Sequence, residues 1–276
     1  MKFRLQTPHG VLKIENEPLI MGILNVTPDS FFDGGKFLDS SVAINHALKM
    51  VEEGAHIIDI GGESSRPSSK RISASEELKR ILPVIKKLRE KSNVILSCDT
   101  YKPEVARTVL DEGVDIINDI FGLRKKNMLE LVRRYDVPVI VMHMKGTPAT
   151  MQKAPQYKNV VDEIYNFFVK RIEYATGNGI SADKIIIDPG IGFGKKFEHN
   201  LTILKNLSIF TSLNKPLLVG ISRKSFIGKI LDVDVHERLE GSLSANIVAV
   251  QNGANILRVH DVLPTVRAIK VFLALQ

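Results

Sequence analysis

The chain has 276 residues, 44% hydrophobic and 25% charged, an ordinary globular composition with length for one large domain or two small ones. No apolar run approaches the roughly 18 residues of a membrane helix, and the N-terminus is too polar for a signal peptide. The one cysteine, Cys98, cannot form an internal disulfide. We therefore expect a cytoplasmic protein. The net charge of +7 is not gathered into the long blocks of nucleic-acid-binding arms, and it suits a small anionic substrate equally well.

A hairpin is the first predicted element. Residues 2–16, KFRLQTPHGVLKIEN, hold two alternating runs on either side of the turn residues Pro8-His9-Gly10. Eight short runs rich in Ile and Val follow, each too short for a helix, and we interpret them as buried parallel strands. The runs lie at 18–31, 55–64, 93–100, 114–120, 137–146, 183–195, 215–224 and 254–261.

Segments with helical spacing separate these runs. We predict helices at 40–55, 73–91, 102–113, 123–134, 160–179, 235–253 and 261–275, with Ser75 capping the second and Pro83 kinking it. Strands that alternate with helices indicate a parallel sheet with right-handed crossovers. Eight such units without a second-domain linker favour an α/β fold of the (β/α)₈ TIM-barrel type over an open doubly wound sheet. We therefore predict a single domain over 1–276, with the N-terminal hairpin capping the barrel bottom.

Polar residues stand where the predicted strands end. The run 93–100 is apolar until it ends in Asp99, a carboxylate that a buried strand has no use for. In a barrel the C-terminal strand ends form one rim, where the βα loops build the site. The rim residues predicted in this way are Asn25, Glu63, Asp99, Asn118, Asp188, Lys224, Arg258 and His260.

The chemistry of the rim sorts into two kinds. Asp99, Asn118 and Asp188 supply carboxylates and an amide that suit a flat heterocycle with N–H donors. Arg66, Arg258 and His260 suit phosphate oxygens, and Asn25 with neighbouring hydroxyls would help there or orient a hydrated metal. Cys/His metal spacings are absent, so the metal to expect is a hard ion held with phosphate oxygens, Mg²⁺.

Several of these residues have a purely structural alternative. Asp99 would then cap the helix that begins near Pro103, Asn118 would be a satisfied strand-end amide, and His143 would be a core histidine. The stretch DPGIGFGK, 188–195, matches neither nucleotide-binding fingerprint. We interpret its glycines as a loop that needs close backbone approach to a ligand, with Phe193 exposed to stack on something flat.

Eight motifs, taken together, closely resemble the dihydropteroate synthase family. They are MGILNVTPDSF, IDIGGESSRP, SCDTYKPEVA, INDI, MHMKGTP, DPGIGFGK, GISRKSFIG and RVHDV, in the family's order and over nearly the whole chain. The resemblance implies a TIM barrel that condenses 6-hydroxymethyl-7,8-dihydropterin pyrophosphate with p-aminobenzoate. The products are 7,8-dihydropteroate and pyrophosphate, a step of folate synthesis. It also implies Mg²⁺, sensitivity to sulfonamides and a homodimer through the last helices.

The resemblance implies roles for matching positions. The catalytic set is Asp99, Asp188, Lys224, Arg258 and His260. The pterin pocket is Asp99, Asn118, Met142, Asp188, Gly220 and Lys224. The pyrophosphate site is Asn25, Arg66, Arg258 and His260, with Asn25 toward the metal. The p-aminobenzoate site is Ser65, Pro67, Phe193, Lys224 and Ser225. A mobile first loop that orders over the substrates carries Asp29, Phe31 and Asp33.

One motif departs from the family pattern. SSRPSS, 64–69, stands where the family has Ser-Thr-Arg-Pro-Gly, so Ser65 lacks a methyl group and Ser68 replaces the glycine. One methyl contact is worth about 1 kcal/mol. The two differences therefore affect the expected geometry of the aminobenzoate loop and the expected drug sensitivity, but not the expected reaction. Two alternatives share the pterin pocket. One is a pterin-dependent corrinoid methyltransferase, and the other is a non-catalytic pterin-binding homologue.

Overall fold

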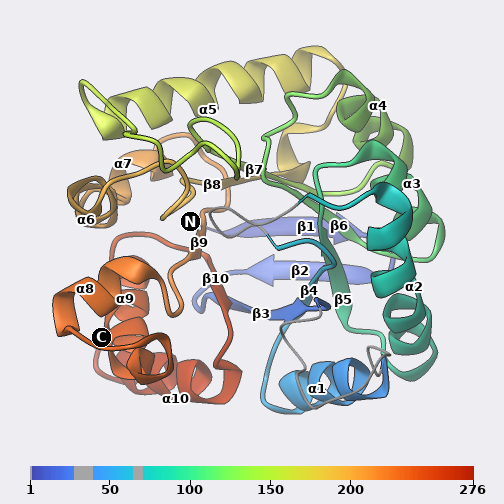
Figure 1. Cartoon of the computed structure of the whole chain (residues 1–276), viewed down its shortest axis with the longest axis horizontal. Helices are drawn as coiled ribbons and strands as arrows, with labels where there is room; N and C mark the ends of the chain where they lie inside the picture. The colour runs from blue at the N-terminus through green and yellow to red at the C-terminus, as the bar shows by residue number, and fades with distance from the viewer. Residues whose placement is uncertain (1, 28–39, 65–70) are drawn as a thin grey trace.

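The computed structural model of the chain describes residues 2–27, 40–64 and 71–276, and it is a barrel of eight parallel strands (Figure 1). The strands are β3 (Leu19–Asn25), β4 (Ile57–Gly61), β5 (Ile95–Asp99), β6 (Ile116–Asp119), β7 (Val139–Met142), β8 (Ile185–Asp188), β9 (Leu218–Gly220) and β10 (Ile256–Val259). Their order is β8-β7-β6-β5-β4-β3-β10-β9, and a parallel bridge between Ile187 and Leu217 joins the two outer strands. Each strand lies inside a predicted run, and the predicted barrel is confirmed.

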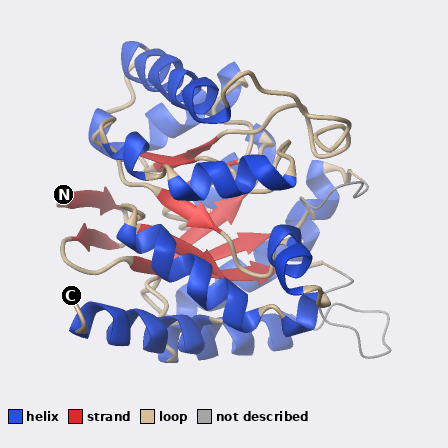
Figure 2. Cartoon of the chain, turned by 90° about the vertical axis from the view of Figure 1, so that its left-hand side faces the viewer, coloured by secondary structure: helices blue, strands red, loops and turns tan. Residues whose placement is uncertain are grey.

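Helices surround the strands on the outside (Figure 2). They are α1 (Ser40–Glu52), α2 (Ala74–Lys91), α3 (Pro103–Asp111), α4 (Lys126–Tyr135), α5 (Val160–Gly177), α6 (Phe197–Lys205), α7 (Ser208–Thr211), α8 (Ser225–Leu231), α9 (Leu239–Gln251) and α10 (Val262–Ala274). The predicted cap of α2 is wrong by two residues, because Ser73 and not Ser75 accepts the hydrogen bond from the Glu76 amide, at 3.1 Å. The Ser73-x-x-Glu76 spacing is that of a capping box.

The inside of the barrel is apolar at the bottom. The first inward-facing side chain of each strand lies in one cluster, which also contains Leu5, Leu12 and Ile14 of the hairpin. The hairpin strands are β1 (Phe3–Thr7) and β2 (Gly10–Ile14). The hairpin therefore closes the bottom of the barrel, as predicted.

A buried carboxylate fastens the hairpin turn to the barrel. Asp115 is fully buried and accepts hydrogen bonds from the His9 amide at 3.0 Å and the Leu96 amide at 2.9 Å. It also pairs with the guanidinium of Arg89. A buried charge is tolerated only with such partners, so this end of the barrel is built for stability.

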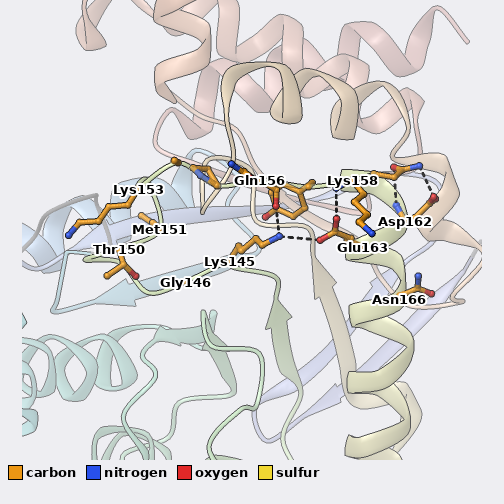
Figure 3. Close-up of a pocket in the computed structure, with 14 residues that line it drawn as sticks. Lys145, Gly146, Thr150, Met151, Lys153, Gln156, Lys158, Asp162, Glu163 and Asn166 are labelled. Atoms are coloured by element: carbon orange, nitrogen blue, oxygen red, sulfur yellow. Dashed lines mark hydrogen bonds and ion pairs between the residues drawn. The ribbon is translucent and has the colours of Figure 1, made fainter.

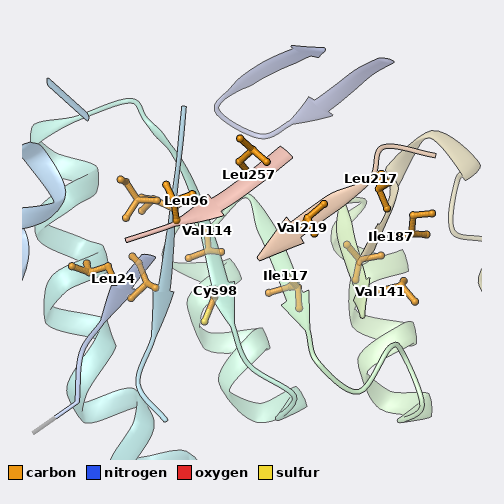
Figure 4. Packing of buried hydrophobic residues seen from close by; sticks show 14 of the residues in the cluster. Leu24, Leu96, Cys98, Val114, Ile117, Val141, Ile187, Leu217, Val219 and Leu257 are labelled. Atoms are coloured by element: carbon orange, nitrogen blue, oxygen red, sulfur yellow. The ribbon is translucent and has the colours of Figure 1, made fainter. Parts of the chain in front are cut away.

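A second apolar layer fills the space between strands and helices. Leu24, Leu96, Ile117 and Val141 point outward from their strands into this layer (Figure 4). Cys98 lies in the same layer with no exposed surface, and burial raises the pKa of its thiol well above the usual value. Among the described residues, no helix is long and apolar enough to cross a membrane.

Candidate active site

The upper half of the barrel interior is polar because side chains alternate along each strand. In three strands the inward-facing residue of the bottom layer is an isoleucine, and the next inward-facing residue, two positions later, is polar. Asp59 follows Ile57 in this way, Asn118 follows Ile116, and Asp188 follows Ile186. The parallel register then aligns the strand ends, and it pairs Asp99 with Asn118 and Met142 with Asp188. The strand order thus gathers side chains that lie far apart in the sequence.

Arg258 and Asp59 form the centre of the polar group. The Arg258 Nε lies 2.6 Å from Asp59 Oδ2, and its Nη2 lies 3.0 Å from Asp99 Oδ2. The amide of Asn118 donates to the same Asp59 Oδ2 at 3.0 Å. Asp99 therefore pairs with Arg258, and its alternative role as a helix cap is wrong, since Lys102 occupies the cap position of α3.

Asp59 was not predicted as a site residue. It lies inside an apolar run, two residues before the end of β4, whereas the predicted site residues stand at strand ends. Its position on the same face as Ile57 and Gly61 was the signal that would have found it. Asp59 has no exposed surface, and its Oδ1 has no hydrogen-bond partner among the described residues.

Burial and neighbouring charges perturb the titration of this group. Burial raises the pKa of Asp99 to about 7, Arg258 opposes this shift, and the charge of Asp59 adds to it. For Arg258, burial works against the charge, but Asp59 and Asp99 outweigh it and the pKa is raised. The guanidinium is thus held charged inside the barrel, and Asp99 titrates near neutrality.

Asp188 and Lys224 lie on the other side of the barrel mouth. Asp188 Oδ1 accepts a hydrogen bond from the Gly190 amide at 2.7 Å, and burial raises its pKa. The Lys224 Nζ donates to the carbonyl oxygen of Ile191 and stands 4.8 Å from the centre of the Phe193 ring. Burial lowers the pKa of Lys224 to about 8, against the attraction of Asp188.

The glycines of DPGIGFGK make close approaches to the backbone of another loop. Gly190 and Gly194 both have φ of +65°, and a Cβ atom there would stand 2.1 Å from the His143 oxygen and 2.3 Å from the Lys145 oxygen. Phe193 is half-buried rather than exposed. His143 is a buried histidine, and burial lowers the pKa of its ring to about 2.

The other predicted residues surround this group or fall outside the described chain. Met142 is buried at the end of β7, Gly220 pairs with Arg258 across two strands, and Ser225 is the exposed first residue of α8. Asn25 ends β3, and His260 follows β10 with Nδ1 at 3.1 Å from the Ser222 hydroxyl. The predicted residues Asp29, Phe31, Asp33, Ser65, Arg66 and Pro67 lie outside the described residues.

Glu63 has a supporting role at the rim. Its carboxylate accepts hydrogen bonds from Lys102 Nζ at 2.6 Å, from the Tyr101 hydroxyl at 2.7 Å and from the Ile72 amide at 3.1 Å. Lys102 also reaches Glu77 at 2.6 Å. Glu63 therefore joins the end of β4 to the start of the segment before α2.

A cleft of about 930 Å³ lies beside the barrel mouth, formed by the loop after β7 and the start of α5 (Figure 3). The amine of Lys145 stands 4.2 Å from the Tyr157 ring centre and 3.2 Å from Glu163. Of the predicted site residues that the structure describes, none lines this cleft. Over the same described part of the chain, no group of three His, Cys, Asp or Glu side chains is placed to hold a metal.

Comparisons with known proteins agree with this geometry. Residues 21–260 match the family of pterin-binding enzymes. The dihydropteroate synthase of Escherichia coli K12 is 47% identical over 256 residues, which is 93% of this chain and 91% of that protein. A Xanthomonas albilineans dihydropteroate synthase with 4-aminobenzoic acid has a TM-score of 0.94 at 42% identity, over 100% of this chain and 99% of the other. The Yersinia pestis enzyme in a sulfonamide drug complex has a TM-score of 0.93 at 42% identity, over 99% and 98%. The chain belongs to the dihydropteroate synthase family.

Proposed function

We propose that the polar upper half of the barrel is where this chain condenses 6-hydroxymethyl-7,8-dihydropterin pyrophosphate with p-aminobenzoate. The reaction is that of the family, an alkyl transfer in folate biosynthesis that gives 7,8-dihydropteroate and pyrophosphate. The observation that carries the assignment is the buried group of Asp59, Asp99, Asn118 and Arg258 inside the barrel mouth.

Unsatisfied acceptors support a pterin in this position. Asn118 Oδ1 is buried and has no hydrogen-bond partner among the described residues, although its amide nitrogen is bound to Asp59. Buried acceptors are nearly always paired, so an N–H donor of a ligand is the natural partner. The carboxylates of Asp99 and Asp188 add charge-assisted acceptors for ring and exocyclic N–H groups. Met142 and Gly220 are proposed to complete the pterin pocket.

The pyrophosphate end is proposed to lie with Asn25, Arg66, Arg258 and His260. Within the described part of the chain, carboxylates engage the Nε and Nη2 of Arg258, and we propose Nη1 for a substrate oxygen. The Asn25 amide oxygen suits Mg²⁺ carried on pyrophosphate oxygens, since this ion keeps most of its waters and seldom occupies an all-protein cage. Among the described residues, no carboxylate cluster is placed to hold a metal. Asn25 would hold it there, and the ion would supply charge neutralisation of the leaving group.

The order of bond changes follows from these charges. Loss of pyrophosphate leaves a cationic methylene conjugated with the pterin, and ionised Asp99 and Asp188 stabilise that positive charge. The weakly basic amine of p-aminobenzoate then forms the C–N bond and loses its proton. No covalent enzyme intermediate is required. For the amine substrate we propose the neighbourhood of Phe193, Lys224 and Ser225, with Ser65 and Pro67 from the loop outside the described residues.

The test is a two-product assay on the purified protein with both substrates and Mg²⁺. We expect equal amounts of pyrophosphate and dihydropteroate, both dependent on p-aminobenzoate. Asp99→Asn should lower kcat/KM by about tenfold to a hundredfold, the worth of one charge-assisted hydrogen bond. The exposed Asp232 has a left-handed backbone that suits asparagine, so Asp232→Asn is a matched control that should change nothing.

Other outcomes identify the alternatives. Pterin binding without pyrophosphate release would indicate a non-catalytic homologue. Pterin-dependent methyl transfer to cobalamin would indicate a corrinoid methyltransferase. Near-normal kinetics of Asp99→Asn would contradict the role given to that carboxylate.

A homodimer through the last helices is also proposed. Val248 in α9, Val271 in α10 and Leu275 after it are 44%, 62% and 79% exposed, and apolar side chains on this pair of helices suit a protein interface. Light scattering should give twice the mass of one chain, and Val271→Asp should halve it. A monomeric wild-type protein would overturn this proposal.

A further inference from the structure

We propose that Lys195 is a positioning residue for the amine substrate. Its buried side chain ties the loop that carries Phe193 to His143 at the end of β7, and so sets where the Phe193 ring stands against Lys224. The inference rests on the proposed function, because it assumes that Phe193 and Lys224 face p-aminobenzoate.

The contacts of Lys195 are unusual for a lysine. The residue is 3% exposed, and its Nζ lies 3.0 Å from His143 Nδ1, 3.2 Å from the His143 oxygen and 3.0 Å from the Phe193 oxygen. A lysine amine offers up to three N–H donors, so each donor has an acceptor. Burial keeps the His143 ring neutral, and in the tautomer with its proton on Nε2 the Nδ1 lone pair accepts from Lys195. One buried side chain thus joins two loops.

The two loops also touch through their backbones and through two further side chains. Gly190 and Gly194 lie so close to the oxygens of His143 and Lys145 that neither position has room for a Cβ atom. Gln152 Nε2 donates to the Gly192 oxygen at 2.7 Å, and the Tyr157 hydroxyl donates to the Gly194 oxygen at 2.8 Å. The segment from His143 to Tyr157 therefore supports the loop 190–194 along its length.

This support acts on the aminobenzoate end of the site more than on the pterin end. Phe193 and Ile191 both belong to the supported loop, and both contact Lys224. Asp99 and Asn118, by contrast, are held on β5 and β6 by strand register, and Arg258 also holds Asp99. The third pterin carboxylate, Asp188, accepts from Gly190 of the supported loop but is itself fixed on β8 by the register with β7. Loss of the Lys195 contacts should therefore shift the Phe193 ring and leave those pterin ligands in place.

The experiment separates the two substrates. We expect Lys195→Met to raise the KM for p-aminobenzoate about tenfold, the effect of one lost hydrogen-bonded anchor, while the KM for the pterin pyrophosphate changes less than twofold. Lys205, exposed on the neighbouring helix α6, gives the matched control Lys205→Met, which should behave as the wild type. Lys195→Gln keeps hydrogen-bond donors and should recover part of the loss.

A double-mutant cycle shows whether Lys195 acts through Phe193. If it does, adding Lys195→Met to Phe193→Ala should leave the KM for p-aminobenzoate unchanged from that of Phe193→Ala alone. If Lys195 had only a structural role, the effects of Lys195→Met and Phe193→Ala on the KM for p-aminobenzoate would multiply. The KM values for both substrates would then also rise together. Either of those results overturns the proposal.

A milder variant covers the case in which Lys195→Met does not fold. Tyr157→Phe removes one hydrogen bond to the same loop and should raise the KM for p-aminobenzoate twofold to threefold, again without changing that for the pterin. An unchanged KM in this variant counts against the supported loop. Failure of the wild type to form dihydropteroate would overturn the proposed function and this inference together, whereas product formation with equal losses for both substrates would overturn this inference alone.

Discussion

Asp59→Asn tests the centre of the site, because the substitution keeps the size of the side chain and removes only its charge. In the native barrel Asp59 Oδ2 accepts from Arg258 Nε at 2.6 Å and from Asn118 Nδ2 at 3.0 Å, while Oδ1 has no partner among the described residues. An asparagine that keeps both bonds to its oxygen must place its NH₂ group where Oδ1 stood, a buried place where Oδ1 has no hydrogen-bond partner among the described residues. The ion pair becomes a hydrogen bond from a charged donor to a neutral oxygen, and a further polar group is buried, which together should cost about 2–3 kcal/mol of unfolding free energy.

The same substitution should change how activity depends on pH. The charge of Asp59 is one of the causes, after burial, that raise the pKa of Asp99 to about 7. Removal of that charge lowers the pKa of Asp99, so the acid limb of the kcat/KM profile should move to lower pH. Urea unfolding and kcat/KM from pH 5 to 9 measure both effects, with Asp232→Asn as the surface control. An acid limb that stays in place, with unfolding free energy within about 0.5 kcal/mol of wild type, would refute the coupling of Asp59 to Asp99.

Three further predictions concern the rim and the fold. The wild-type kcat/KM should be bell-shaped, rising through pH about 7 as Asp99 ionises and falling above about 8 as Lys224 loses its proton; a flat profile from pH 6 to 9 would contradict both roles. His260→Ala should weaken product inhibition by pyrophosphate about tenfold, the worth of one hydrogen bond to a charged group. The affinity for a pterin that lacks pyrophosphate should not change. An unchanged inhibition constant for pyrophosphate would show that His260 does not belong to that site. Ser73→Ala should lower the free energy of unfolding by about 1 kcal/mol at unchanged kcat, whereas an equal loss in Ser75→Ala would show that the cap is misassigned.

Sequence patterns predict the barrel well because its strands are buried on both faces. A run such as 183–195 contains a strand of only four residues, Ile185–Asp188, yet its Ile-rich core is unmistakable. The hairpin was predicted for a different reason, the alternation on both sides of the turn at Pro8. The runs do not predict the length of each strand, because in several of them the loop residues after the strand are also apolar.

The helices between Asp188 and Leu239 were harder to predict. α7 and α8 have only four and seven residues, less than two full turns of about 3.6 residues each, and α6 has nine. The α8 segment begins within the motif GISRKSFIG, and its N-cap residue, Lys224, makes no side-chain capping bond that would mark the start of a helix. Short helices of this kind are stabilised by packing on the barrel rather than by their own sequence.

The glycine-rich loop shows where local sequence reasoning stops. The glycines of DPGIGFGK do require a close approach, as their pattern suggested, but the approaching group is the backbone after β7. Nothing near Gly190 or Gly194 in the sequence identifies His143 and Lys145 as those neighbours. The pattern predicts that space is needed, and only the tertiary structure shows what fills it.

Asp59 and Arg258 show the same limit at the centre of the site, and they also explain why the site works. The two residues are 199 positions apart, so no local pattern links them. A guanidinium beside Asp99 alone would hold that carboxylate in a simple ion pair and draw its pKa down. Burial raises the pKa of Asp99 to about 7, Arg258 opposes that shift, and Asp59, which takes the Nε side of Arg258, adds to it through its own negative charge. The barrel thus holds a cation in its interior between two carboxylates, and one of them, Asp59, lies inside its strand where no strand-end position marks it.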